Sequence, residues 1–464
     1  MKNFNRRNFL KKASLSTASL YMTSNLASSE EYEKNPSGGS YMGDFAAPKL
    51  QTIRIAIIGL GARGSGHAKQ LGTIEGTEIV ALSDLYEDLV DRSFYSCMNV
   101  GKGRHQNIAR YFGDENQWKK MLVEVKPDAV IIATNWNNHA KMAIESMKQG
   151  AHAFVEVPIA VTLNEMWEII NTSEQTQKHC MMMENVNYGR EELLYLNLCR
   201  KGVIGDLLHA EAAYIHELRF QMEEPVRGTG SWRTHHYAKR SGNLYPTHGL
   251  GPVAQYMNLG RGEDQFRSMV SFSSPAKGRK QYAEKNYPKD HKWNALDYKG
   301  GDLNTSVIKT NLGRTIMVQW DETSPRPYTR HNLIQGTKGT LAGFPTRVAL
   351  EGGVLGVTEN HHSWVKDKEL EALYEKYDHP MYKRLGALAK KMGGHGGMDF
   401  IMRYRIVECL REGIPLDQNV YEGSFWSAVS PLSEASVAQE GMPQKFPDFT
   451  RGAWSQTKPL AIIT

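Results

Sequence analysis

Between residues 53 and 187, short runs of consecutive apolar residues alternate with longer stretches in which apolar residues recur at helical spacing. Uninterrupted apolar runs are typical of strands that are buried on both faces of a parallel sheet. The expected strands are Ile55–Ile58, Glu78–Leu82, Asp128–Ala133, His152–Val155 and a further core strand around Met181–Met183. Three helices are expected: one begins at His67, and the other two span Trp118–Lys126 and His139–Gln149. This order of strands and helices predicts repeated βαβ units.

The second half of the chain has a different pattern, in which apolar and polar residues alternate one by one. This period of two predicts strands that are buried on one face. The expected strands are Leu207–His216, Gln265–Ser273, Thr305–Asn311 and Arg314–Trp320, the last two joined by a glycine-containing turn as a hairpin. Two helices, Asp399–Arg411 and Trp426–Glu440, follow near the C-terminus, and we expect both to pack against this sheet.

A glycine turn follows the first strand and carries the clearest chemistry of the sequence. Gly59, Gly61 and Gly64 have the spacing of a dinucleotide-binding turn, and Asp84 ends the next strand about twenty residues later. Gly59 permits the tight turn, Gly61 lets the backbone approach a diphosphate, and Gly64 lets the helix pack on the strand. A carboxylate at position 84 suits ribose hydroxyls and repels a 2′-phosphate, which favours NAD over NADP. The alternative is a glycine turn in a βαβ protein that binds no nucleotide.

Polar residues follow three of the expected parallel strands. They occupy positions 134–139, 156–158 and 184–188. Ligands of open parallel sheets bind beyond the carboxyl ends of the strands, so these residues are expected to surround the nicotinamide end of the cofactor. Helix capping is the alternative explanation for any one of them.

Composition and charge exclude several classes of protein. The 464 residues allow two or three domains, and a net charge of +6 without a dense Lys/Arg run beyond the N-terminus gives no reason to infer nucleic-acid binding. No segment has the length of about 18 apolar residues that a membrane span needs. The cysteines lack paired spacing, which favours free thiols over a zinc site; they are Cys97, Cys180, Cys199 and Cys409. We expect no metal, because the neighbouring histidines of His235–His236 and His361–His362 would diverge on a strand.

The N-terminus has the character of a targeting segment. Arg6 and Arg7 precede Phe9–Lys11 and a mildly apolar stretch over 13–26, with a small residue near 27 for cleavage. This segment resembles a twin-arginine export signal, which carries folded proteins across a membrane. We therefore expect residues 1–30 to be a signal peptide, residues 31–50 a linker, and the protein periplasmic or secreted. A disordered basic tail is the alternative.

Further motifs make the chain resemble a known family. The glycine turn, Asp84 and Glu156-Val157-Pro158 resemble the superfamily of glucose–fructose oxidoreductase and inositol dehydrogenase, although that superfamily usually has lysine where this chain has Val157. Other motifs are similar to those of family 109 glycoside hydrolases, the NAD-dependent α-N-acetylgalactosaminidases; these are Trp136–His139, Asn185–Arg190, Trp232–Arg233, Tyr245–Pro252 and Gly394–Asp399. The resemblance implies an α/β fold with a Rossmann parallel-sheet domain over 51–187. It also implies a substrate-binding α+β domain over 188–464 with a mostly antiparallel sheet and C-terminal helices.

The resemblance also implies an unusual hydrolysis. Oxidation of the sugar at C3 would acidify the proton on C2, elimination would release the C1 substituent, and addition of water and reduction would complete the cycle. NAD-dependent families are recognised exceptions to the two-carboxylate mechanism of glycosidases. The expected substrate is a small glycoside or a glycan terminus, and a homo-oligomer is left open. The alternatives are an exported NAD-dependent sugar oxidoreductase and a binding protein in which the nucleotide is structural.

The resemblance assigns roles to individual residues. Tyr188 would remove the C2 proton and would need a lowered pKa; Tyr245 and His248 would contact the C3 oxygen, and Glu156 would orient the nicotinamide or a hydroxyl. The expected sugar-binding residues, which could project from the second sheet, are Tyr214, Arg233, Tyr245, His248 and Tyr328. The expected NAD-binding residues are Gly59, Gly61, Arg63, Gly64, Asp84, Trp136, Asn137, Asn138, His139, Glu156, Val157 and Asn185. We expect a structural role for His395.

Overall fold

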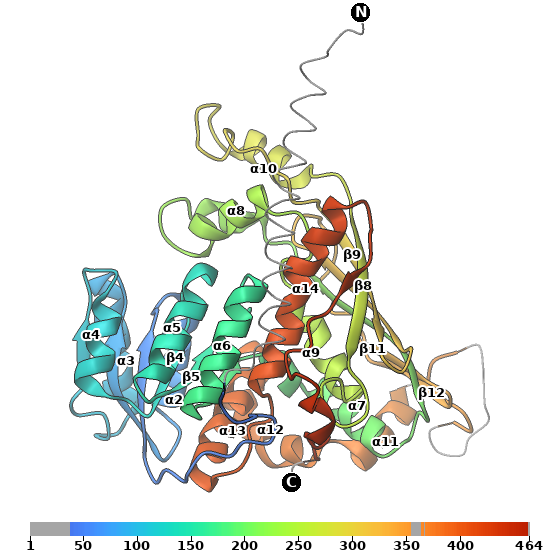
Figure 1. Ribbon diagram of the computed structural model, residues 1–464, viewed down its shortest axis with the longest axis horizontal. Helices are drawn as coiled ribbons and strands as arrows, with labels where there is room; N and C mark the ends of the chain where they lie inside the picture. The colour runs from blue at the N-terminus through green and yellow to red at the C-terminus, as the bar shows by residue number, and fades with distance from the viewer. Residues whose placement is uncertain (1–37, 354–362, 366, 463–464) are drawn as a thin grey trace, which may run out of the picture.

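The computed structural model describes residues 38–353, 363–365 and 367–462, which form two sheets with helices packed around them (Figure 1). The expected signal peptide and the pair His361–His362 lie outside the described residues. Residues 38–50, within the expected linker, run along the protein, where Tyr41 stacks on Tyr421 at 4.8 Å between ring centroids.

The first sheet is the expected parallel sheet, with the order β3-β2-β1-β4-β5-β6. Its strands are β1 (Ile53–Ile58), β2 (Thr77–Ser83), β3 (Ala109–Tyr111), β4 (Ala129–Ile132), β5 (His152–Val155) and β6 (Cys180–Met182). Its helices are α2 (Ala62–Leu71), α3 (Glu87–Val100), α4 (Gln117–Val125), α5 (Trp136–Lys148) and α6 (Leu163–Thr176). Successive strands are added on one side of β1 as far as β3 and on its other side from β4 onward. The position between β1 and β4 is therefore a topological switch point, where open α/β sheets bind ligands. The Rossmann prediction is confirmed.

The second sheet is mixed but mostly antiparallel, with the order β13-β12-β11-β7-β10-β9-β8-β14. Among the described strands of this second sheet, only β7 and β10 pair in parallel. Its strands are β7 (Leu207–Ile215), β8 (Phe266–Ser273), β9 (Asn304–Thr310), β10 (Thr315–Asp321), β11 (Leu333–Gly336), β12 (Gly339–Ala342), β13 (Arg347–Leu350) and β14 (Gln444–Lys445). The hairpin of β9 and β10 is confirmed, whereas the short strands β11–β13 were not anticipated.

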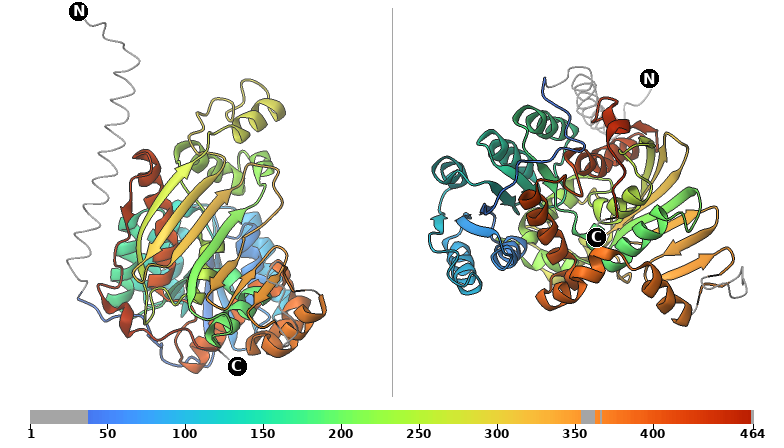
Figure 2. Two further views of the ribbon diagram at one scale, coloured as in Figure 1. Left: turned by 90° about the vertical axis from the view of Figure 1, so that its right-hand side faces the viewer. Right: turned by 90° about the horizontal axis from the view of Figure 1, so that it is seen from below.

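Helices cover one face of the second sheet, and Figure 2 (left) shows the strands standing in front of them. The helices that follow the Rossmann unit are α7 (Arg190–Arg200), α8 (Thr229–Lys239), α9 (Thr247–Tyr256), α10 (Gly278–Asn286), α11 (Asp367–Tyr377), α12 (Pro380–Met392), α13 (Met398–Glu412) and α14 (Val420–Ala438). Four short 3₁₀ segments complete the chain: η1 (Asn185–Tyr188), η2 (Arg219–Glu223), η3 (His395–Gly397) and η4 (Ala453–Gln456). As expected, α14 packs on β8, where Phe425 stacks on Phe266 at 5.4 Å.

The expectation that α13 packs against the same sheet is wrong. This helix lies against α2 and β1 of the Rossmann unit, and Phe400 and Ile401 share a buried apolar cluster with Ile53. The reason is that α13 buries apolar residues around much of its circumference and also carries Arg403, which bonds to His67 on α2. Periodicity alone does not indicate which of two sheets such a helix covers.

The segments between β7 and β8 and between β8 and β9 together form a separate small cluster, which lies near the top of Figure 1. It contains α8 and α10 around the buried residues Met222, Ala238, Ala283, Trp293 and Tyr298. His235–His236 lies on α8 and not on a strand as expected, because residues 229–239 form a helix.

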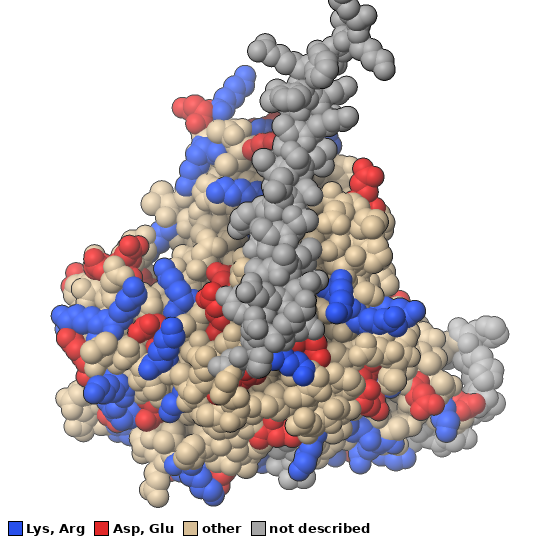
Figure 3. All heavy atoms as spheres, viewed as in Figure 1, with Lys and Arg blue, Asp and Glu red and all other residues tan. Residues whose placement is uncertain are grey.

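Other sequence expectations concern the whole chain. The cysteines are free thiols, as expected, three of them buried and Cys199 half-buried. No helix in the described ranges is long and apolar enough to cross a membrane. Over residues 38–353, 363–365 and 367–462 we find no cluster of three or more His, Cys, Asp or Glu side chains suited to a metal. On the face that Figure 3 shows, acidic and basic side chains are interspersed.

Candidate active site

A cleft of about 1100 Å³ lies between the two units at the switch point of the Rossmann sheet. One wall consists of the glycine turn and the carboxyl ends of β1, β2, β4 and β5, and the other of residues from β7, α8, α9 and the segments between them. The volume exceeds the range of roughly 300–1000 Å³ that is usual for small-ligand sites. It is large enough for a dinucleotide and a second ligand.

The glycine turn has the geometry that a diphosphate requires. Gly59 has φ +86°, and a Cβ added there would lie 2.5 Å from the carbonyl oxygen of Ala133. A Cβ on Gly64 would lie 1.7 Å from the carbonyl oxygen of Gly59, whereas a Cβ on Gly61 would meet no protein atom within 4 Å. The first turn of α2 has neither a side-chain cap nor an acidic residue. Its free N–H groups therefore suit an anionic phosphate, and the turn fits the expected cofactor.

Asp84 lies at the cleft, next to the turn. Its Oδ2 accepts a hydrogen bond from the backbone N–H of Leu60 at 2.6 Å, and its Oδ1 accepts one from Tyr86 at 3.0 Å. Each carboxylate oxygen can accept more than one bond, so capacity remains for ribose hydroxyls.

Most of the other predicted cofactor residues also line the cleft: Arg63, Trp136, Asn138, His139, Glu156, Val157 and Asn185. Two do not. Gly64 lies behind the turn, where it allows α2 to approach Gly59, and Asn137 is exposed on the outer side of α5. The expectation of direct contact is therefore wrong for Asn137, because one helical face cannot present three consecutive side chains to the same ligand.

A buried charge network supports Glu156 at the strand end. Arg63 lies 2.9 Å from its Oε1, and His67 Nε2 lies 2.7 Å from the same oxygen. Arg403 donates to Nδ1 of His67 at 2.8 Å, so the neutral ring carries its proton on Nε2 and donates it to Glu156. Burial lowers the pKa of His67 to about 4, with a further contribution from the charge of Arg403. Arg63 therefore places a positive charge beside Glu156.

These contacts decide the ionisation of Glu156. Burial alone would raise the pKa of this carboxyl group, but the charge of Arg63 and the hydrogen bond from His67 outweigh burial and lower the pKa well below its usual value. Glu156 is therefore an ionised acceptor at the cleft near neutral pH, suited to orienting a ligand and unsuited to donating a proton.

Asp399, which the sequence analysis did not assign, connects the network to His395. Its carboxylate accepts hydrogen bonds from Asn185 Nδ2 at 2.6 Å and from Arg63 at 2.8 Å, and it lies 2.9 Å from Nδ1 of His395. His395 lines the cleft, with 59% of its side chain exposed, so the structure does not give it the purely structural role that we expected. Gly394, Gly396 and Gly397 have positive φ angles, which bend the backbone around His395. These glycines are the feature of the sequence that marks the position.

His248, the first cleft side chain of α9, has a buried carboxylate behind it. Its Nδ1 lies 2.6 Å from Oε1 of Glu184, which is fully buried at the end of β6. An Nδ1–H donated to Glu184 leaves Nε2 as an acceptor, the form that a general base requires. In the sequence, Glu184 is one of the polar residues at positions 184–188, and no motif connects it with His248.

Aromatic rings surround Arg233 on the same wall. Its guanidinium carbon lies 5.1 Å from the ring centroid of Trp136, 5.5 Å from that of Trp232 and 4.9 Å from that of Tyr245. The Nε of Arg233 is buried and has no hydrogen-bond partner among the residues that the structure describes. A charged donor in this situation suits a carbonyl or hydroxyl oxygen of a ligand, and the rings suit the C–H face of a sugar.

We expected the sugar-binding side chains to project from the second sheet, but only some of them do. Tyr214 projects from β7, but Arg233 belongs to α8, His248 to α9, and Tyr245 to the turn before α9. His216, which was not predicted, also lines the cleft, where its Nδ1 lies 3.0 Å from the hydroxyl of Tyr214. The helices approach the cleft because the chain between β7 and β8 returns over the carboxyl end of β7.

Tyr188 is in a different place from the one that its predicted role requires. Its hydroxyl donates to Asp417 at 3.2 Å, its side chain is buried in an apolar cluster with Leu193, and it does not line the cleft. Burial and the charge of Asp417 raise the pKa of Tyr188 well above its usual value, whereas a base needs a lowered one. The expectation of a cleft base at this position is therefore contradicted by the geometry.

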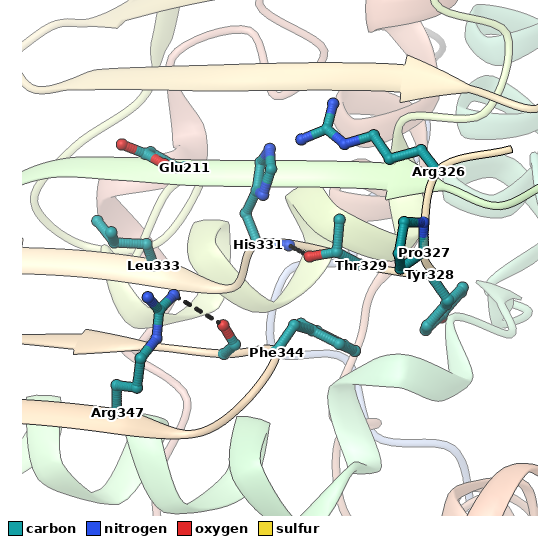
Figure 4. A pocket seen from close by; sticks show the side chains of 10 residues that line it. Glu211, Arg326, Pro327, Tyr328, Thr329, His331, Leu333, Phe344 and Arg347 are labelled. Carbon is teal, nitrogen blue, oxygen red and sulfur yellow. Dashed lines mark hydrogen bonds between the residues drawn. The ribbon is translucent and has the colours of Figure 1, made fainter. Parts of the chain in front are cut away.

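Tyr328 lies at the margin of the site. It lines a second cavity of about 310 Å³, with Tyr328 at one end and Glu211 and Leu333 at the other (Figure 4). Its ring centroid is 5.0 Å from that of His216 and 6.2 Å from that of Tyr214, and its hydroxyl accepts a hydrogen bond from Arg330 at 2.6 Å. It therefore contacts cleft residues from outside and does not form the cleft wall.

Comparison with known families separates the chain at the same place as the two units. Residues 53–184 match the family described as "Oxidoreductase family, NAD-binding Rossmann fold". Residues 188–456 match the one described as "Glycosyl hydrolase 109, C-terminal domain". The two matches together include both walls of the cleft.

Curated relatives match over most of the chain. Glycosyl hydrolase family 109 protein 1 of Akkermansia muciniphila is 63% identical over 427 residues, which cover 92% of this chain and 88% of the relative. A glycosyl hydrolase family 109 protein of Shewanella baltica is 52% identical over 466 residues and the full length of both chains.

Solved structures share the fold at low sequence identity. A levoglucosan dehydrogenase in complex with NADH and levoglucosan superposes with a TM-score of 0.63 at 17% identity, covering 86% of this chain and all of that chain. The apo scyllo-inositol dehydrogenase of Lactobacillus casei gives a TM-score of 0.58 at 13% identity, covering 86% of this chain and 99% of that chain.

Proposed function

The chain belongs to glycosyl hydrolase family 109 and uses NAD as its cofactor, and from this premise we propose that it hydrolyses terminal α-N-acetylgalactosamine residues without consuming NAD. The observation that carries the proposal is the pairing of Glu156 with Arg63 at 2.9 Å and with His67 at 2.7 Å. A conventional glycosidase needs a carboxylic acid with a raised pKa to protonate the leaving group. Arg63 and His67 lower the pKa of Glu156 instead, which supports an oxidative route.

When bound, NAD supplies the oxidation of the sugar at C3 and its reversal, which makes the C2 proton acidic in between. The side chains of the cleft would perform the accompanying proton transfers and binding. His248 would take the proton of the C3 hydroxyl on Nε2, since Glu184 holds Nδ1. Tyr245 would donate a hydrogen bond to the same oxygen, since burial raises the pKa of its phenol and keeps it protonated. Arg233 would donate to the acetamido carbonyl.

The base at C2 needs a different residue from the expected Tyr188, whose hydroxyl is directed to Asp417. His395 lines the cleft, and Asp399 orients its ring through Nδ1. The 2.9 Å contact with Asp399 favours a proton on Nδ1 and leaves Nε2 to accept one. We therefore assign the removal of the C2 proton to His395 and a structural role to Tyr188.

The proposal is tested by incubating the purified protein with an aryl α-N-acetylgalactosaminide in deuterium oxide without added cofactor. We expect release of the aryl alcohol and incorporation of deuterium at C2 of the product, with no net change in nicotinamide absorbance. Release without deuterium would contradict elimination. Accumulation of NADH, dependent on added NAD, would instead identify a sugar oxidoreductase.

We also propose that the protein is exported in its folded, cofactor-loaded state by the twin-arginine route. The proposal rests on Arg6 and Arg7 and on the NAD-binding turn, because the cofactor is made in the cytoplasm. Replacing both arginines by lysine should leave the precursor inside the cell, as measured by fractionation. Continued export of the lysine variant would contradict this route.

A further inference from the structure

A loop of the second unit reaches across the cleft to the Rossmann unit. Val226, Arg227 and Gly228 precede α8, whose first residue is Thr229, and all four line the cleft opposite Leu85 and Tyr86. Leu85 and Tyr86 follow Asp84, the residue placed to bind ribose. The loop therefore covers the end of the cleft where the adenosine half of NAD would lie.

Two contacts of Arg227 join the walls there. Its Nη2 lies 2.7 Å from Oδ2 of Asp88 in the first turn of α3, and its guanidinium carbon lies 4.2 Å from the ring centroid of Tyr86. All three residues are on the surface, with 39% of the Arg227 side chain and 67% of the Asp88 side chain exposed. Exposed ion pairs and cation–π contacts are weak individually, and they break and reform readily.

The loop is anchored at both of its ends. Lys292 donates a hydrogen bond to the carbonyl of Pro225, and the backbone N–H of Gly230 donates to Glu224 at 3.2 Å. Gly228 has φ +102°, and a Cβ there would lie 2.5 Å from the Glu224 carboxylate. The anchored backbone therefore holds residues 226–229 as a short span with Arg227 directed at the Rossmann unit.

We propose that Arg227, Asp88 and Tyr86 form a clasp that retains NAD, and that the clasp must open before the cofactor can leave. The proposal rests on the cofactor use assigned above and goes beyond it by naming the residues that set the release rate. An enzyme that returns its cofactor to the starting state in every turnover gains nothing from exchanging it. Closure by weak, exposed contacts slows release without preventing loading.

The chain contains a matched control on the same helix. Arg110 lies 2.7 Å from Asp91 of α3, and its guanidinium carbon lies 4.9 Å from the ring of Phe94. This pair has the same chemistry and distance as the clasp, but both of its residues belong to the Rossmann unit. Substitution of Arg110 or Asp91 therefore removes an exposed ion pair between β3 and α3 but no contact between the two walls of the cleft.

The experiment measures how fast the purified holoenzyme loses NAD after dilution into buffer that contains an NAD-consuming trap, with retained NAD quantified after rapid gel filtration. We expect Arg227→Gln and Asp88→Asn each to accelerate loss about three- to tenfold, and Tyr86→Leu to do so by a smaller factor. Arg110→Gln and Asp91→Asn should release NAD at the wild-type rate. Raising the salt concentration should accelerate release more in the wild type than in Arg227→Gln.

A charge exchange separates the clasp from direct contact with NAD. The double variant Arg227→Asp with Asp88→Arg should release NAD more slowly than Arg227→Gln, because the ion pair is reformed across the cleft although the contact of Arg227 with Tyr86 is lost. Release by Arg227→Gln within twofold of wild type, equal acceleration by Arg110→Gln, or failure of the exchange to slow release relative to Arg227→Gln would overturn the clasp. These rates are measured without a glycoside, so a protein that lacks the proposed hydrolysis still gives a clear result here.

Discussion

The two walls of the cleft differ in how their charged groups are paired. On the Rossmann wall, Arg63, Glu156 and Asp399 are held in mutual ion pairs. On the opposite wall, the buried Nε of Arg233 has no hydrogen-bond partner within the described part of the chain, and aromatic rings surround the guanidinium. The difference indicates that the charged groups of the Rossmann wall are paired before a ligand binds, whereas Arg233 on the opposite wall leaves a charged donor for a ligand to use.

The largest expected effect is a loss of kcat when one of the proposed proton-transfer residues is replaced, and the buried Tyr188 should not show it. His248→Ala and His395→Ala should each lower kcat by about 10²- to 10⁴-fold, the usual contribution of general acid–base catalysis. Tyr188→Phe should lower kcat by less than about tenfold, because the hydroxyl bonds to Asp417 away from the cleft. Steady-state kinetics on an aryl glycoside measure all three, with His209→Ala on β7 as the control. A loss in Tyr188→Phe as large as in His395→Ala would restore the role that the sequence suggested.

Removing the unpaired donor of the sugar wall should have the next largest effect. Arg233→Met should lower kcat/KM by about 10- to 100-fold, since hydrogen bonds to charged groups contribute about 1.5–3 kcal/mol. Arg233→Lys should recover only part of this, because an ammonium group lacks the planar donor set. Lys239→Met, an exposed change on the same helix, should leave kcat/KM unaltered. Equal kinetics for Arg233→Met and Lys239→Met would show that the substrate does not use this donor.

Three glycine substitutions separate packing from cofactor binding on the Rossmann wall. Gly64→Ala should lower the free energy of unfolding by about 1–3 kcal/mol, because its Cβ meets the Gly59 carbonyl at 1.7 Å. Gly61→Ala should leave the stability of the cofactor-free protein unchanged but weaken NAD binding, because its Cβ meets no protein atom. Gly66→Ala, also in open space, should affect neither property adversely. Denaturant unfolding and NAD titration measure the two properties, and normal NAD affinity in Gly61→Ala would place the diphosphate elsewhere.

The smallest effect concerns the protonation of His67. Burial, with the charge of Arg403, lowers the pKa of His67 to about 4, compared with about 6.5 in an unfolded chain. Between these values the unfolded chain binds a proton that the folded protein does not, so the free energy of unfolding decreases as the pH falls from 6.5 toward 4. Near pH 5 this one group contributes a slope of about 1.4 kcal/mol per pH unit.

His67→Gln should reduce the slope by this contribution, because a glutamine can accept from Arg403 and donate to Glu156 without titrating. The other buried histidines whose pKa is lowered, such as His152 and His379, keep their contributions. Urea unfolding at several pH values between 5 and 7 measures the slope. This interval lies above the range in which the carboxylates of Glu156 and Asp399 would contribute. A variant with the same pH slope as the wild type would show that His67 is not the group that titrates.

The two walls also differ in how much of them could be predicted from the sequence. The glycine turn and Asp84 depend on local backbone geometry, and a short motif specifies them. The pair Arg63 and Asp399 joins residues from opposite ends of the chain, and its formation depends on α13 docking on α2. The positions of Tyr188 and His395 depend on such packing as well: the hydroxyl of Tyr188 bonds to Asp417, whereas His395 lines the cleft. A motif identifies a polar residue next to a turn but not the side of the turn that faces the cleft.

The docking of α13 on β1 and α2 has a consequence for biosynthesis. The first strand of the Rossmann sheet leaves the ribosome long before the helix that completes its apolar surroundings. An N-terminal fragment that ends after β6 would leave Ile53 and Ile55 without their α13 neighbours, and it would lack the partners of Arg63 and His67 that this helix provides. The Rossmann unit is therefore completed by a later part of the chain, and translation must pass Glu412 before its interior can close.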